Sequence, residues 1–406
     1  MTATVTTGTR SHVLITANSP GEVAGWVLPV AESLRALNPE AEIILVLPPC
    51  QYASGKEARV VADWPAIQRV VTLRGLSGAL LLGRKALGLS RDADARVLFL
   101  GGDVFHAVSL ARRIGARCYA YLPKPRWSGS LDKSFVPDAA AAERFAARGV
   151  PTSRYEVVGQ LALDSVRPGR AAAEVRRDLG IGQDAPLIVL LPGSRPLFSR
   201  FLIPYLAQVA AAMHAGRPGL QFVTCLSPFL GDDLLDDPLQ DTWPPGQGRQ
   251  ESASAAGGAA LQFTTQPALD VIAAGDLAIA IPGTTTLQIA ALGVPQIVFL
   301  PLQRPDLIPL EGLLGLLPAG VWPMTYLRRR VTEVVGMGPQ PMALPNMIAG
   351  RRIVPELRGH IEPPDVAAEA LGLLEDEDRR RKMVGECLEI TAERGAAERI
   401  AAGVLA

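Results

Sequence analysis

The sequence predicts an α/β fold of two Rossmann-like, doubly wound domains followed by a helical C-terminal segment. Short runs rich in Val, Ile and Leu alternate with Ala-, Arg- and Leu-rich segments of helical period, as expected for buried parallel strands covered by helices. This series of runs ends near residue 159 and restarts at residue 186. A chain of 406 residues is long enough for both domains.

Strands are expected in two groups, and the domain boundaries follow from them. The first group comprises 12–17, 42–47, 96–102, 117–122 and 155–159, and the second 186–194, 220–227, 260–265, 277–282 and 296–301. We therefore expect domains at 1–168 and 169–360, and helices at 361–406 that are able to pack back on the first domain. Ligands of open parallel sheets bind at the carboxyl ends of the strands, so we expect the functional groups of both domains there, across a shared cleft.

Composition and charge exclude several classes of function. The 40 Lys and Arg residues balance 40 Asp and Glu residues, so the chain lacks the basic excess of a nucleic-acid-binding protein. Its four cysteines lie far apart without CxxC spacing, which favours a reducing cytoplasm over a disulfide framework or a zinc site. Neither a signal segment nor an apolar run long enough to span a bilayer is present. Any membrane contact is therefore expected to be peripheral.

The loop after the first strand contains Gly21 and Glu22 and precedes an expected helix at 23–37. A flexible glycine and an acid beside exposed helix N–H groups form a suitable ligand-binding loop. An ordinary strand-to-helix turn, in which Glu22 complements the helix dipole, explains the same residues.

Gly101, Gly102 and Asp103 follow the strand at 96–102. Asp103 is the candidate general base, because a partly desolvated carboxylate at a strand end can remove the proton of a hydroxyl nucleophile. An N-cap for the helix starting at Val104 is the alternative. His106 follows one helical turn later and is able to assist Asp103, although a packed histidine explains it equally well.

Two segments of the second domain are suited to phosphate. Gly193, Ser194 and Arg195 follow a strand and offer N–H groups, a hydroxyl and a guanidinium, which together suit a diphosphate. The alternative is a surface turn with a solvated arginine. Gly283, Thr284 and Thr285 follow the expected strand at 277–282 and open a helix, whose N–H groups and dipole suit a phosphate. Plain N-capping by threonine is the alternative.

Other nucleotide and metal motifs are missing from the sequence. It contains neither GxxxxGK[ST] nor a complete GxGxxG after a strand, which argues against kinase and dinucleotide-binding functions. The pair Asp92 and Asp94 precedes a strand and is interpreted as a solvated turn. We therefore expect no cofactor and no metal ion.

Taken in order, these segments resemble the lipid A disaccharide synthase family. The matching segments are Gly21–Gly25, Gly102–Asp103, Leu191–Arg195, Gly283–Gln288 and Pro345–Arg351. The resemblance implies a GT-B-like pair of facing domains and a cytoplasmic protein peripheral to the inner membrane. It also implies inverting transfer of an acylated glucosamine-like sugar from a UDP-sugar to a lipid-linked or sugar-phosphate acceptor. A homodimer is left open.

The resemblance also implies roles for individual residues. Asp103 would activate the acceptor hydroxyl and Arg195 would hold the donor diphosphate. The nucleotide-sugar side would comprise Gly193, Ser194, Gly283, Thr284, Thr285, Gln288 and Asn346, and the acceptor side Gly21, Glu22 and His106. The sequence departs from the family at Trp26, His106 and Gln288, each of which replaces a family carboxylate.

Two other functions remain open at this stage. A UDP-sugar 2-epimerase uses the same double Rossmann fold but needs further acids and a histidine. A non-catalytic descendant that binds a nucleotide-sugar or a lipid would account for the replaced carboxylates. Residues 73–91 and 310–317 combine leucines with flanking polar groups, and each fits either an interfacial membrane segment or a core helix.

Overall fold

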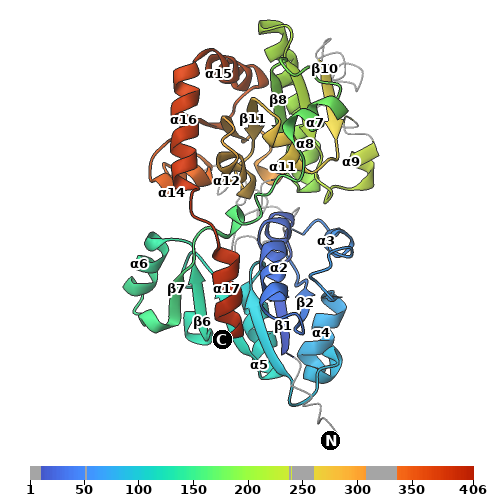
Figure 1. The fold of residues 1–406 in the computed structure, drawn as a ribbon, viewed down its shortest axis with the longest axis vertical. Coiled ribbons are helices and arrows are strands. Elements are labelled where there is room, and N and C mark those ends of the chain that lie inside the picture. The colour runs from blue at the N-terminus through green and yellow to red at the C-terminus, as the bar shows by residue number, and fades with distance from the viewer. Residues whose placement is uncertain (1–10, 51–52, 237–238, 240–259, 308–335) are drawn as a thin grey trace, which may run out of the picture. The chain divides into compact units, whose positions relative to one another are not determined.

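The computed structural model describes residues 11–50, 53–236, 239, 260–307 and 336–406, which form two compact units (Figure 1). The first unit comprises the described residues up to Ser165 together with Glu393–Ala406, and the second comprises those of Val166–Ala392. Residues 310–317 lie outside the described part of the chain. Each unit is an α/β domain built on its own sheet, as the sequence predicts.

The first unit contains a parallel seven-stranded sheet in the order β3-β2-β1-β4-β5-β6-β7. The strands are β1 (Ser11–Thr16), β2 (Glu42–Val46), β3 (Arg69–Val71), β4 (Asp94–Phe99), β5 (Arg117–Tyr121), β6 (Lys133–Val136) and β7 (Tyr155–Val157). The helical segments are α1 (Pro20–Glu22), η1 (Val23–Val27), α2 (Leu28–Leu37), α3 (Glu57–Val60), α4 (Leu73–Leu82), η2 (Gly83–Leu87), α5 (Val104–Ile114), η3 (Ser128–Ser130), α6 (Ala139–Ala147), η4 (Thr152–Arg154), η5 (Leu161–Leu163) and α17 (Ala396–Leu405).

The second unit contains a parallel six-stranded sheet in the order β10-β9-β8-β11-β12-β13. The strands are β8 (Leu187–Leu191), β9 (Gln221–Cys225), β10 (Ala260–Thr264), β11 (Leu277–Ala280), β12 (Gln296–Pro301) and β13 (Glu356–Gly359). The helical segments are α7 (Ala172–Asp178), α8 (Pro196–Gly216), α9 (Asp232–Asp236), α11 (Ala268–Ala273), α12 (Thr284–Ala291), η6 (Pro305–Leu307), α14 (Leu344–Ala349), α15 (Pro363–Glu375) and α16 (Glu377–Ile390).

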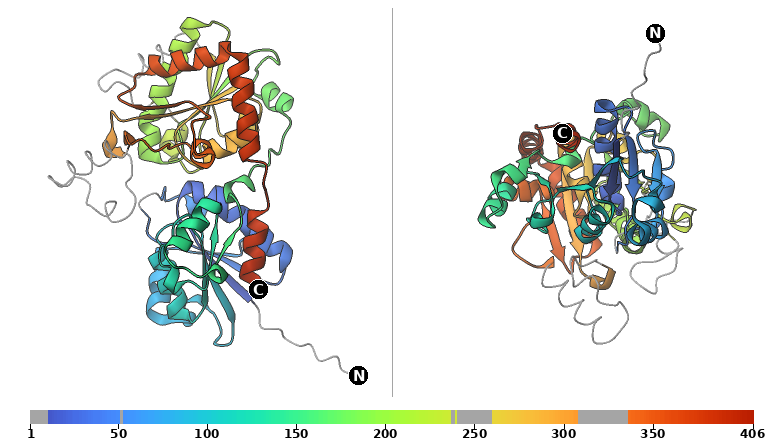
Figure 2. Two further views of the ribbon diagram at one scale, coloured as in Figure 1. Left: turned by 90° about the vertical axis from the view of Figure 1, so that its left-hand side faces the viewer. Right: turned by 90° about the horizontal axis from the view of Figure 1, so that it is seen from below.

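Helices cover both faces of each sheet (Figure 2), which explains why the central strands are apolar throughout. In β1, Leu14 joins the core cluster of α4, α5 and α6, whereas its neighbours Val13 and Ile15 are buried on the other face. In β8, Ile188 packs in the cluster of α8 and α15, and Val189 packs with α7 and α11. Each sheet is therefore the middle layer of three.

The expected strands are all present, and the structure adds β3, β6 and β13. These three strands are three or four residues long and contain charged or small polar residues, as in Lys133–Val136 and Glu356–Gly359. β3 and β13 form sheet edges, where one neighbour is missing and less apolar surface is required. The three segments contain no continuous apolar run, so the sequence did not predict them as strands.

The helix expected at 23–37 begins at Pro20 and contains the π-helical stretch η1 before α2. Pro29 stands near the start of α2 and has no N–H to donate to the preceding turn. The loss of that donor is consistent with the wider turn in this part of the helix. Within the described residues, no helix is both long and apolar enough to cross a membrane.

The C-terminal helices divide between the two units, because α15 and α16 lie in the second and α17 returns to the first. Asp164 fixes the start of α17. Its Oδ1 accepts a hydrogen bond from the backbone N–H of Gly395 at 2.7 Å, and its Oδ2 accepts one from that of Ala397 at 2.6 Å. The Arg399 guanidinium donates to the carbonyl oxygen of Val158 at 2.6 and 2.9 Å. The last residues are thus an integral layer of the first unit.

We predict that Asp164→Ala destabilises the first unit by about 2 kcal/mol or more, because two N–H groups at the start of α17 lose their carboxylate acceptor. Urea unfolding and limited proteolysis measure the effect, and proteolysis should release a C-terminal fragment. Asp184→Ala removes an exposed carboxylate and is the matched control. Equal stability of the two variants would contradict the anchoring role of Asp164.

Candidate functional site

In both units the strand order reverses at the middle of the sheet, between β1 and β4 and between β8 and β11. The crossover connections leave opposite faces of the sheet at such a point, which opens a crevice at the carboxyl ends of the two strands. Gly21 and Glu22 follow β1, and Asp103 follows β4. In the second unit Gly193–Arg195 follow β8, and Gly283–Thr285 follow β11. The expected segments therefore flank the two reversal points.

The structure brings the loops of the first unit into contact. A Cβ atom at Gly101 would lie 2.0 Å from Oε2 of Glu22, so the Glu22 side chain lies directly over that glycine. Gly102 has a φ of +84°, and a Cβ atom there would lie 3.2 Å from Cγ of Pro48. Gly102 is favoured by its left-handed backbone, whereas a side chain at Gly101 would require the Glu22 side chain to shift.

The loop after β2 is a component that the sequence analysis missed. Nδ2 of Asn18 donates a hydrogen bond to the carbonyl oxygen of Pro48, which ties the loops after β1 and β2 together. Both residues directly follow apolar runs, and that position was the signal available in the sequence.

Asp103 is the N-cap of α5 and remains exposed. Its Oδ1 accepts a hydrogen bond from the backbone N–H of Phe105 at 2.9 Å. The expected partial desolvation of this carboxylate is not present, because the residue is exposed. The same exposure leaves the carboxylate accessible to a ligand at the reversal point.

His106 does not assist Asp103 in the expected way. Its Nδ1 is buried and has no hydrogen-bond partner among the described residues. The ring packs edge-on against Phe105, with ring centroids 5.5 Å apart. Packing in the first turn of α5 therefore explains His106 better than direct support of the carboxylate.

The loops of the second unit are also in contact. Gly193 has a φ of +89°, and a Cβ atom there would lie 2.7 Å from Cδ1 of Ile281, the residue that follows β11. Ser194 is half-buried, and Arg195 is the exposed N-cap of α8. A hydroxyl and a guanidinium thus lie at the reversal point, beside the segment that leads into α12.

Three threonines begin α12, and Thr286 has a structural role whereas Thr284 and Thr285 lie at the helix N-terminus. The hydroxyl of buried Thr286 donates to the carbonyl oxygen of Gly283 at 2.8 Å and accepts from the N–H of Leu344 at 3.3 Å. Thr284 and Thr285 are half-buried in the first turn, where N–H groups have no acceptor within the helix and the helix dipole favours an anion.

Gln288 lies one turn after Thr284 on the same side of α12 and is half-buried. The first turn of the helix and Gln288 therefore form one continuous surface of hydroxyl and amide groups.

Asn346 is a correction to the expected site. It is fully buried in α14. Its Nδ2 donates to the carbonyl oxygen of Val354 at 2.9 Å and to Oε1 of Glu356 at 2.7 Å. Its Oδ1 accepts from the N–H groups of Ile353 at 2.6 Å and Val354 at 2.8 Å. Because these bonds use both donors and both acceptor positions of the amide, we assign Asn346 to the structure of the unit and remove it from the nucleotide-binding set.

Trp26 packs edge-on against Tyr121 with ring centroids 5.6 Å apart. The Tyr121 hydroxyl donates to the carbonyl oxygen of Gly159 at 3.2 Å and accepts from the N–H of Leu161 at 3.2 Å. Burial raises the pKa of Tyr121 above its ordinary value. Trp26 therefore contributes aromatic packing to the helical segment that follows β1.

Three of the four cysteines, Cys118, Cys225 and Cys387, are buried. Burial raises the pKa of Cys118, Cys225 and Cys387 to about 12, which keeps these thiols protonated near neutral pH. Among the described residues, no three His, Cys, Asp or Glu side chains are grouped so that they could hold a metal ion.

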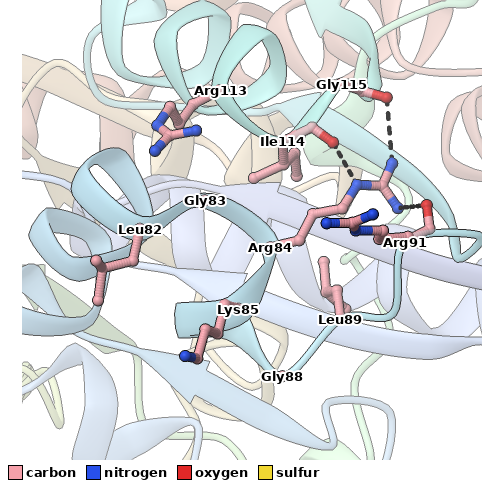
Figure 3. A pocket seen from close by; sticks show the side chains of 10 residues that line it. All are labelled: Leu82, Gly83, Arg84, Lys85, Gly88, Leu89, Arg91, Arg113, Ile114 and Gly115. Carbon is pink, nitrogen blue, oxygen red and sulfur yellow. Dashed lines mark hydrogen bonds between the residues drawn. The ribbon is translucent and has the colours of Figure 1, made fainter.

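Figure 3 shows a basic depression of about 760 Å³ elsewhere in the first unit. Its lining segments precede β4 and β5, so it lies at the amino ends of these strands, opposite to Asp103. The Arg84 guanidinium donates to backbone carbonyl oxygens that include those of Ala93 and Ile114. Arg113 donates to the carbonyl oxygens of Leu80 and Leu81. These arginines stabilise turns, and we assign no small-molecule ligand to the depression.

The two Rossmann-like units with loops at both reversal points define a GT-B-like fold. Solved structures agree with this class. The structure of MurG from Acinetobacter baumannii matches with a TM-score of 0.52 at 14% identity, covering 97% of this chain and 99% of that chain. UDP-GlcNAc 2-epimerase from Neisseria meningitidis, solved with bound UDP-GlcNAc, matches with a TM-score of 0.56 at 14% identity and the same coverage.

The sequence is distantly homologous to lipid-A-disaccharide synthase. The chain is 25% identical to the enzyme of Geobacter sulfurreducens over 99% of its own length and 98% of that protein. It is 27% identical to the enzyme of Syntrophus aciditrophicus over 72% of its own length and 69% of that protein. No family model matches the chain.

We predict that Gly101→Ala destabilises the first unit by about 1–3 kcal/mol, because the new methyl group occupies the position of the Glu22 carboxylate. In a Glu22→Ala background the same substitution should cost clearly less. A double-mutant cycle measured by thermal unfolding gives the coupling energy. Gly129→Ala adds a methyl group in open space and serves as control. Strict additivity would exclude the contact.

Proposed function

We propose that this protein is an inverting glycosyltransferase that moves an acylated glucosamine-like sugar from a UDP-sugar to a lipid-linked or sugar-phosphate acceptor. The observation that carries the proposal is the nearly full-length homology to lipid-A-disaccharide synthase. The positions of Asp103 and Arg195 at the reversal points of the two sheets support it. Solved structures of the same fold class hold UDP-GlcNAc or UDP-glucose.

In this proposal the first unit activates the acceptor. Asp103 removes the proton from the acceptor hydroxyl as its oxygen attacks the anomeric carbon of the donor. The attack takes place on the face opposite the UDP leaving group, and the configuration at that carbon is therefore inverted. Exposure of the carboxylate and its place beside Gly101 and Gly102 give the hydroxyl access.

The second unit binds the donor in this proposal. The Arg195 guanidinium and the N–H groups at the start of α12 stabilise the negative charge that develops on the UDP diphosphate. Gly193, Ser194, Thr284 and Thr285 line the same reversal point and supply hydroxyl and backbone donors. Gln288 offers a neutral amide oxygen to the nucleotide where the family has a carboxylate, which reduces the charge at that position.

We predict that Asp103→Asn lowers kcat by about 10²–10⁴-fold and leaves the unfolding temperature and UDP affinity nearly unchanged. Asparagine caps a helix about as well as aspartate but cannot accept the proton. Arg195→Ala should instead weaken UDP binding by about tenfold or more, because charge-assisted hydrogen bonds are lost. Transfer assays with UDP-sugars, together with calorimetry of UDP, separate the two effects.

Three outcomes of these assays would contradict the proposal. Full transfer activity in Asp103→Asn would exclude the general base. Conversion of a UDP-sugar to its 2-epimer without an acceptor would establish the epimerase function instead. UDP binding without turnover over a broad panel of acceptors would indicate a non-catalytic binding protein.

We further propose that α4 and η2 contact the inner membrane surface. Leu81 and Leu82 are 75% and 65% exposed, and Lys85 is exposed nearby. Leu76 and Ala79 pack in the core of the unit, so the exposed leucines near the end of α4 are available to contact a membrane. Leucines beside a cation suit the interface of an anionic bilayer.

The double variant Leu81→Ser/Leu82→Ser should bind phosphatidylglycerol-containing vesicles severalfold more weakly than the parent, because the inserted apolar surface is lost. Vesicle co-sedimentation at two salt concentrations measures the effect. Leu37→Ser changes a leucine that is 48% exposed on α2 and is the control. Unchanged binding of the double variant would exclude α4 as the contact.

A further inference from the structure

Two large aromatic side chains are exposed together beside the first reversal point. Phe105 is 50% exposed in the first turn of α5, and Trp127 is 46% exposed in the loop after β5. Their ring centroids are 6.0 Å apart, and the planes meet at 55°. β4 and β5 are neighbours in the sheet, so both residues follow adjacent strands at the same edge as Asp103.

The backbone at Trp127 is strained. Its φ is 55°, and among the described residues it is the one non-glycine residue with a positive φ. A bulky residue in this region costs about 1–3 kcal/mol and is found most often at functional sites. The Trp127 side chain is 46% exposed, so part of its ring surface remains available to a ligand.

Phe105 is directly coupled to the candidate general base, because its backbone N–H donates to Oδ1 of Asp103 at 2.9 Å. Phe105 is therefore two residues from that carboxylate, in the first turn of the helix that Asp103 caps. The loop of Trp127 also contains Lys124 and Arg126, and both are exposed. Positive charge thus lies close in sequence to the aromatic pair.

We propose that Phe105 and Trp127 form a stacking platform for the pyranose ring of the acceptor and thereby set its position relative to Asp103. The C–H face of a pyranose is apolar and weakly positive, which suits the negative face of an aromatic ring. Lys124 and Arg126 complement an anionic substituent on the same sugar. This assignment rests on the proposed transferase function and specifies the acceptor residues of its site.

The platform is tested with Trp127→Gly and Phe105→Ala. Glycine adopts a positive φ without strain, so Trp127→Gly removes the ring while the loop conformation is retained or stabilised. Phe105→Ala keeps the backbone N–H that caps Asp103. We expect each variant to raise the KM for the acceptor about fivefold to tenfold, with kcat at saturating acceptor and the KM for the UDP-sugar unchanged. Phe105→Tyr should restore the parental KM, and Val157→Ala, at another exposed apolar position, is the control.

Direct binding of glucosamine 1-phosphate, followed by saturation-transfer NMR, separates this inference from the transferase proposal. Loss of the signal in both variants supports the platform, even if no transfer is detected with any UDP-sugar. Transfer with unchanged acceptor KM in both variants overturns the platform and leaves the transferase proposal intact. Absence of binding to the parent protein also overturns it. So does weaker vesicle binding of the variants with parental sugar binding, since the rings would then be membrane contacts.

Discussion

The reversal of strand order at the middle of each sheet is the constraint on which the rest of this structure depends. Connections between parallel strands are right-handed, so helices on opposite faces must leave the sheet in opposite directions. The crevice between β1 and β4, and that between β8 and β11, follows from this geometry. Close approach of side chains at these points then favours glycine, as at Gly101 and Gly193. Asp103 and Arg195 follow strands at these reversal points, so the same strand order also places the charged groups of the candidate site.

Charged side chains have different roles at the two edges of each sheet. At the amino edge, Arg84 in the first unit and Arg176 in the second donate to several backbone carbonyl oxygens of nearby turns. Such arginines satisfy carbonyl groups that precede the strands. At the carboxyl edge, Asp103 and Arg195 are exposed helix N-caps. The basic depression around Arg84 is therefore weak support for a ligand site, because its arginines already bind backbone carbonyl groups. The exposed charges of Asp103 and Arg195 at the strand reversals are stronger support.

Aromatic contacts surround the loops of the first unit that follow β1 and β4. Trp26 packs against Tyr121, and His106 packs against Phe105, which in turn lies against Trp127. These rings provide apolar surface in the same unit as the exposed carboxylate of Asp103. The surroundings of the candidate site therefore combine aromatic packing with an exposed acid at the N-cap of α5.

The sequence by itself determined the two doubly wound domains, the principal strands and the loops that contain Asp103, Arg195 and Thr284. Strands buried on both faces require continuous apolar runs, and the residues after such runs lie at the ligand-binding edge. Only the tertiary structure decided the short strands β3, β6 and β13, the structural role of Asn346 and the pairing of Phe105 with Trp127. These features depend on which segments become neighbours in the sheet. That choice is made by packing between residues distant in the chain, and no local pattern records it.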